Sequence, residues 1–181
     1  MTHTFDVGAY IPGQDTPRLA EADTSECPDA GDRNVAAEPT FVEPPPPPAE
    51  AQGSDKYYFY GWPVTAATLE RLLTKYEPPP GSTHYLQTVI MLSRGLQAAS
   101  TFRPIYCTFI QPHEEDGPLP TLRHPLPGLS FFMISASEDA GGLPFSSRRA
   151  TREQMDKLVE ILGSEPCWRQ DAWPKSKFCY Y

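Results

Sequence analysis

The sequence has no long apolar run. Its longest strongly apolar stretches are Val89–Leu92 and Phe131–Ile134, whereas a helix that crosses a bilayer needs about 20 apolar residues. The N-terminus also lacks the basic start and apolar stretch of a secretory signal. These absences predict a protein that neither spans a membrane nor is secreted, and therefore a cytoplasmic or nuclear location.

Cysteine is scarce, and no two cysteines lie close together. The four cysteines stand at positions 27, 107, 167 and 179, so the spacings of zinc knuckles and CxxC redox motifs are missing. Without a secretory signal, scattered cysteines are typical of reduced thiols inside the cell. The GxGxxG, P-loop, GxSxG and HExxH motifs are absent as well. The sequence therefore predicts no cofactor, and the missing motifs favour a non-enzymatic protein without deciding the question.

Positive charge is never in surplus. The net charge is −8, and residues 1–56 account for all of it with 11 acidic and 3 basic residues, while residues 57–181 hold 12 of each. A nucleic-acid-binding domain needs a positive surplus to bind phosphates, and a polybasic membrane-surface protein needs one to bind anionic lipids. We therefore expect neither nucleic acid nor membrane as a partner.

Residues 1–56 are predicted to form a disordered, acidic, proline-rich arm. They contain nine prolines and only three aromatic residues, so they bury too little apolar surface to offset the entropy of ordering. Five consecutive prolines favour a polyproline II rod of about 16 Å. The rod has two interpretations, namely docking to a protein that reads polyproline or a stiff spacer. Its residues are Pro44, Pro45, Pro46, Pro47 and Pro48.

Residues 57–181 are predicted to form a single globular α+β domain, because they hold 18 of the 21 aromatic residues. Helices and strands follow one another without strict alternation, which favours a small antiparallel sheet of three to four strands covered by about three helices. Apolar spacing predicts helices over 65–76, 82–100 and 151–162 and strands over 57–62, 105–110 and 129–134, with one more strand at a sheet edge within 168–181.

Thr151 is predicted to cap the last helix, because Thr151 and Gln154 have the spacing of a capping box. The preceding residues, Arg148-Arg149-Ala150, complete a tetrapeptide that resembles the substrate pattern of basophilic protein kinases. A phosphate on Thr151 would lie at a helix start, beside Arg148, Arg149 and Arg152. The alternative is a capping threonine whose arginine neighbours are simply solvated.

The predicted loop 111–128 carries five prolines and two histidines, and loops of this length are usually functional or mobile. Its imidazoles and carboxylates are suitable ligands for a divalent metal ion, although the spacing matches no known ligand pattern and equally fits a solvated acidic loop. The weak candidates for metal ligands are His113, Glu114, Asp116 and His124.

Two functional hypotheses follow from different classes of protein. The first is a non-enzymatic protein-interaction or scaffold domain with a disordered acidic arm that contains polyproline. The alternative is a small-molecule or metal-dependent enzyme, or a binding protein, with its site under the loop 111–128. No pattern in the sequence predicts an oligomeric state.

Overall fold

The computed structural model describes residues 38–76, 85–118, 128–138, 140, 143, 145 and 149–180. These residues belong to one compact unit that extends from Glu38 to Tyr181. Its three helices and four-stranded antiparallel sheet confirm the predicted α+β class. The disorder predicted for residues 1–37 concerns a segment that lies outside the described residues.

The sheet consists of four antiparallel strands that close on themselves. The strands are β1 (Lys56–Pro63), β2 (Tyr106–Ile110), β3 (Leu129–Ala136) and β4 (Cys167–Pro174), in the order β1-β3-β2-β4. The last strand differs from its prediction, because β4 ends at Pro174 and pairs with β1 on one side and β2 on the other. It is therefore not an edge strand.

A bulge in the β1–β3 pairing shapes the outer face of the sheet. Tyr60 lies opposite Ser135, whereas Gly61 lies opposite Met133, so Ile134 is the extra residue on β3. A Cβ atom at Gly61 would collide with the carbonyl oxygen of Phe132, which explains the glycine at this close approach. Bulges redirect side chains, and Ile134 and Ser135 line the same cavity here although they are consecutive.

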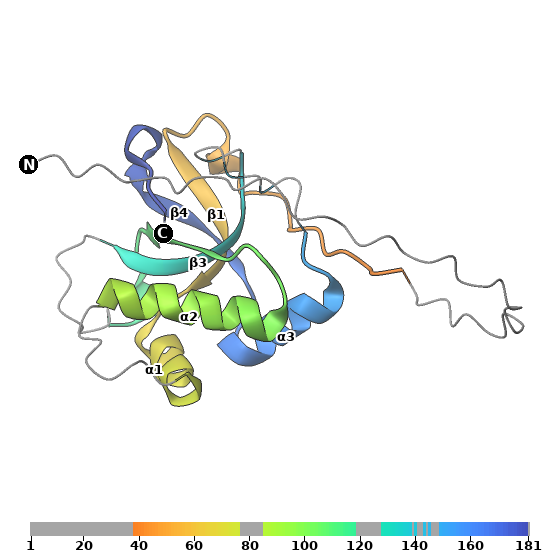
Figure 1. Ribbon diagram of the computed structural model, residues 1–181. Helices are drawn as coiled ribbons and strands as arrows, with labels where there is room; N and C mark the ends of the chain where they lie inside the picture. The colour runs from red at the N-terminus through yellow and green to blue at the C-terminus, as the bar shows by residue number, and fades with distance from the viewer. Residues whose placement is uncertain are drawn as a thin grey trace, which may run out of the picture. The chain divides into compact units, whose positions relative to one another are not determined.

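Three α-helices lie together on one side of the sheet (Figure 1). They are α1 (Ala66–Lys75), α2 (Tyr85–Ser100) and α3 (Arg152–Leu162). Thr65 caps α1 by accepting a hydrogen bond from the Thr68 N–H at 3.1 Å. Gly163, in the left-handed conformation with φ of 77°, ends α3. None of the helices in the described part of the chain is long and apolar enough to cross a membrane.

The two faces of the sheet supply two apolar cores. Side chains alternate along a strand, so Phe132 packs with the helices while its neighbour Phe131 belongs to the inner core. The helix-side core also contains Trp62 and Leu158, which are almost fully buried. The inner core lies inside the closed sheet and is built around Phe59, Phe131, Met133, Ile110 and Leu129.

Residues 38–55, assigned to the arm on composition, contact the domain instead. The Val42 N–H donates to the Ala150 carbonyl at 2.8 Å, and the Arg152 N–H donates to the Thr40 carbonyl at 2.9 Å. Phe41 and Thr151 thereby form an antiparallel bridge. The compact unit therefore begins at Glu38 and not at residue 57, because this segment obtains its partners from residues about a hundred positions away.

Candidate proline-binding groove

The segment Glu38–Pro48, here called the proline strap, crosses the outer face of the sheet from the start of α3. Val42 and Pro44 are half-buried, whereas Pro45, Pro46 and Pro47 are exposed. Pro48 has φ of −60° and ψ of 151°, close to the polyproline II geometry. The predicted polyproline rod thus lies against the domain.

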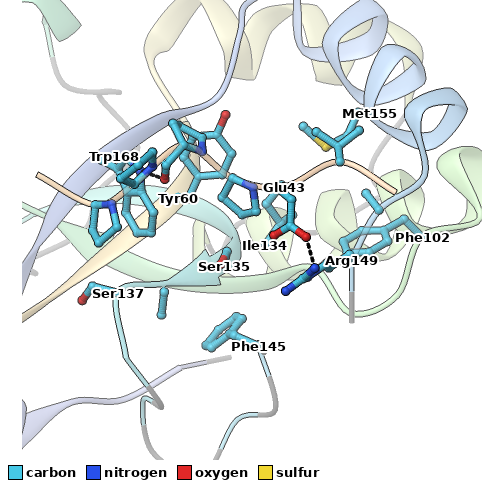
Figure 2. Close-up of a pocket in the computed structure, with 17 residues that line it drawn as sticks. Glu43, Tyr60, Phe102, Ile134, Ser135, Ser137, Phe145, Arg149, Met155 and Trp168 are labelled. Atoms are coloured by element: carbon cyan, nitrogen blue, oxygen red, sulfur yellow. Dashed lines mark hydrogen bonds and ion pairs between the residues drawn. The ribbon is translucent and has the colours of Figure 1, made fainter. Parts of the chain in front are cut away.

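Trp168 on β4 holds the strap against the sheet. Its indole Nε1–H donates a hydrogen bond to the Pro45 carbonyl at 3.0 Å (Figure 2). Tyr60 faces Trp168 across the β1–β4 ladder, and the two ring centroids are 5.3 Å apart. A polyproline II backbone leaves its carbonyls free of internal hydrogen bonds. Aromatic-lined grooves bind such backbones, and the Tyr60–Trp168 pair has this chemistry.

An ion pair holds the strap two residues before Pro45. The Glu43 carboxylate, immediately before the run of five prolines, contacts the Arg149 guanidinium (Figure 2). Both side chains are about half exposed or more, at 63% for Glu43 and 48% for Arg149. Solvent screens such a pair, so it contributes at most about 1 kcal/mol to stability. It depends on the identity of a strap side chain, whereas the other polar contacts of the strap described here involve its backbone.

A cavity of about 280 Å³ remains between the strap and the domain. Its volume is slightly below that of typical small-molecule pockets, which begin at about 300 Å³. The strap residues Val42–Pro47 form one wall. The opposite wall is mainly apolar and includes Phe102, Ile134, Phe145, Ala150 and Met155. The strap therefore covers the groove without filling it.

Thr151 caps α3 as predicted. The Thr151 hydroxyl accepts a hydrogen bond from the Gln154 N–H at 3.2 Å, and the Gln154 side chain accepts one from the Thr151 N–H at 2.9 Å. The structure places this cap and Arg149 beside the proline strap. From the sequence, the threonine site and the proline run are two separate predictions. Arg152 contacts the strap through its backbone, and Arg148 lies outside the described residues. Phosphorylation of Thr151 stays a prediction.

The predicted metal candidates do not converge in the described part of the loop. Asp116 is buried and accepts the His113 backbone N–H at 2.7 Å, and its other oxygen contacts the Arg169 guanidinium. Glu114 is exposed, and His124 lies outside the described residues. Among the residues that the structure describes, no group of three His, Cys, Asp or Glu side chains is placed to hold a metal ion. Asp116 therefore serves an internal ion pair.

A buried carboxylate, Asp171, was not singled out in the sequence. It lies opposite Ile110 and is two residues beyond Arg169, which lies opposite Phe59, so both charged side chains face the inner core. Its Oδ1 accepts the Trp173 N–H at 3.1 Å, whereas its Oδ2 has no hydrogen-bond partner among the residues that the structure describes. Burial raises the pKa of Asp171 to about 6, opposed by hydrogen bonds from Trp173 and Ala172 and by the charge of Lys56.

This raised pKa predicts an unusual dependence of stability on pH. The folded protein binds the Asp171 proton more tightly than the unfolded chain does, so acidification from pH 7.5 to 4.5 should stabilise the fold through this group by about 2 kcal/mol. Asp171→Asn removes the titration. Urea denaturation should therefore show the variant gaining most over wild type at pH 7.5, with the gain reduced by about 2 kcal/mol at pH 4.5. A gain that is equal at both values would contradict the assignment.

Sequence reasoning missed the residues that form the groove. Tyr60 and Trp168 looked like ordinary strand aromatics, because nothing local shows that they face each other across two strands. Comparison with protein-family models, curated protein sequences and solved structures yields no match. Function is therefore inferred from the groove itself.

Proposed function

We propose that this chain is a non-enzymatic protein-interaction domain whose groove binds a proline-rich segment. The proline strap is the ligand supplied in cis. The observation that carries this proposal is the hydrogen bond from the Trp168 indole to the Pro45 carbonyl, beside the ring of Tyr60. An indole N–H and a neighbouring aromatic ring are the groups that recognise a preformed polyproline II backbone.

The strap has the properties of a releasable segment. Within the strap only Val42, Pro44 and Pro48 are half-buried, and Phe41 keeps 57% of its surface exposed. Segments with few buried apolar contacts open at a small fraction of the global unfolding free energy. Opening would expose both partners of the contact, so that the prolines become available to a protein that reads polyproline and the groove becomes available to another proline-rich segment.

The chemistry of the described residues favours an interaction domain over the enzymatic alternative. Cys107 is buried in β2, and burial raises the pKa of its thiol to about 12, so little reactive thiolate forms near neutral pH. Asp116 is engaged by Arg169. We retain the cytoplasmic or nuclear location as part of this proposal, because Cys107 and Cys167 form no disulfide and reduced thiols are typical of those compartments.

The proposal is tested by cutting the strap free of the domain. A protease site inserted between Gln52 and Gly53, in the exposed turn before β1, allows the full-length chain to be cleaved after folding. The N-terminal fragment should then stay bound through the strap and co-elute with the domain in size-exclusion chromatography. Trp168→Phe removes the indole donor and should weaken the retention about fivefold, which is the typical effect of one lost hydrogen bond.

Trp173→Phe is the matched control, since it makes the same change on the same strand at a residue that does not line the groove. It should leave retention within about twofold of the parent chain. Immediate loss of the fragment from the unsubstituted, cleaved protein would refute the proposal. Equal losses with Trp168→Phe and Trp173→Phe would show that the strap does not depend on the indole contact.

A further inference from the structure

We infer that the groove binds in trans a proline-rich peptide of a partner protein that carries an acidic residue immediately before its run of consecutive prolines. This inference rests on the proposed function and adds the chemistry of the partner. The strap shows the arrangement, because Glu43 directly precedes Pro44 and its carboxylate contacts Arg149 (Figure 2).

Three contacts define how a ligand lies in the groove. The Val42 N–H donates to the Ala150 carbonyl at 2.8 Å, and the Pro45 carbonyl accepts from Trp168 at 3.0 Å. Both of these contacts involve the ligand backbone and are therefore compatible with many ligand sequences. Between them lies the ion pair of Glu43, which requires an acidic side chain. An acidic residue at this position therefore sets the register of an otherwise repetitive proline ligand.

The electrostatics of the groove favour an acidic flank. Arg149 stands just before α3, whose N-terminal end carries the positive pole of the helix dipole. Both charges attract a carboxylate and repel a lysine or arginine. The ligand expected here is thus a proline segment with an acidic flank, and peptides with a basic residue at the same place should bind poorly.

Occupation in trans requires that a peptide displace the strap. The strap has the advantage of attachment, since short linkers give millimolar effective concentrations. It leaves a cavity of about 280 Å³ beneath it, however, with an apolar floor that includes Ile134, Phe145 and Met155. A partner peptide that fills this space buries apolar surface that the strap does not bury.

The test uses fluorescence anisotropy with the chain cleaved between Gln52 and Gly53, in which the strap has lost the advantage of attachment, and a labelled peptide that has the sequence of residues 38–50. Changing Glu43 to lysine in the peptide should weaken binding about fivefold or more, the upper range for an exposed ion pair. The same change at Glu50, which is exposed and lies beyond the prolines, is the control and should stay within twofold. Added salt should reduce the discrimination at position 43.

A charge exchange identifies the protein side of the contact. Arg149→Glu in the chain should reverse the preference, so that the peptide with Glu43→Lys binds more tightly than the native peptide. Because weakening the cis strap affects both peptides equally, the ratio of the two dissociation constants within one chain is the quantity to compare. An unchanged ratio in the Arg149→Glu chain would overturn the assignment of Arg149.

Two further outcomes separate this inference from the proposed function. If the cleaved strap is retained but the added peptide does not displace it at any concentration, the groove holds only the strap of its own chain and the partner inference fails alone. If the full-length chain forms a concentration-dependent dimer that Trp168→Phe abolishes, the trans ligand is the strap of a second copy, and the assignment of a different partner is refuted. Loss of the cleaved strap would instead refute the proposed function.

Discussion

Asp116→Ala should lower the free energy of unfolding by about 3–5 kcal/mol, the usual cost of removing one partner from a buried ion pair. The Asp116 side chain is 3% exposed and its partner Arg169 is 5% exposed. Within the described part of the chain, Nη1 of Arg169 already lacks a hydrogen-bond partner, so the guanidinium has little to compensate for the loss. The variant also frees the His113 backbone N–H. Urea denaturation monitored by tryptophan fluorescence measures the change.

Glu115→Ala provides a closely matched control. Glu115 also contacts Arg169, with Oε1 3.3 Å from Nη2, but its own side chain is 74% exposed. A solvent-exposed carboxylate contributes at most about 1 kcal/mol, and the control should lose no more than that. If the two variants lost equal stability, burial of Asp116 would not be the cause. If Asp116→Ala lost no stability because Glu115 alone sufficed as the partner of Arg169, the prediction would be wrong.

Local patterns were sufficient to predict the elements of the fold. The spacing of Met155, Leu158 and Leu162 defines one face of α3, and the structure buries all three side chains. The capping box at Thr151 and Gln154 marks the start of that helix within one turn, because both hydrogen bonds involve residues three positions apart. Such features need no knowledge of the rest of the chain.

Contacts between distant residues were not predictable in the same way. Composition assigned residues 38–55 to a disordered arm, since prolines and glutamates bury little surface on their own. The strap is held by Ala150, Arg149 and Trp168, which lie more than a hundred residues further along the chain. Closure of the sheet through β4 depends on a similar long-range pairing, between Ile110 and Asp171.

The charges in loop 111–128 illustrate why residue type alone did not define a site. His113, Glu114 and Asp116 have the chemistry of metal ligands, yet the Asp116 carboxylate turns inward to Arg169. Arg169 follows directly after Trp168 on β4, so the same strand supplies the groove on its outer face and the ion pair on its inner face. The alternation of a strand thus decides which of two neighbouring residues faces the groove and which faces the buried ion pair.

Leu158→Ala should destabilise the fold by about 2–5 kcal/mol, the range for a leucine truncated in a packed core. Leu158 is fully buried in the core between the helices and the sheet, where Trp62 and Phe132 are also among the largest buried side chains. Truncation removes apolar contacts and leaves a cavity, because the closely packed aromatic neighbours relax little into the space. Thermal and urea denaturation of the full-length chain both report the loss.

Glu153→Ala is the control for this helix, because Glu153 is exposed on the opposite face of α3 and its removal should change stability by about 0.5 kcal/mol or less. The comparison also concerns the groove, since Met155 on the same helix lines the cavity beneath the strap. Leu158 does not line that cavity, so the Leu158→Ala variant should retain the cleaved strap under conditions where it remains folded. Equal destabilisation by the two substitutions would contradict the packing of α3, whereas release of the strap from folded Leu158→Ala protein would show that the groove depends on the precise seating of this helix.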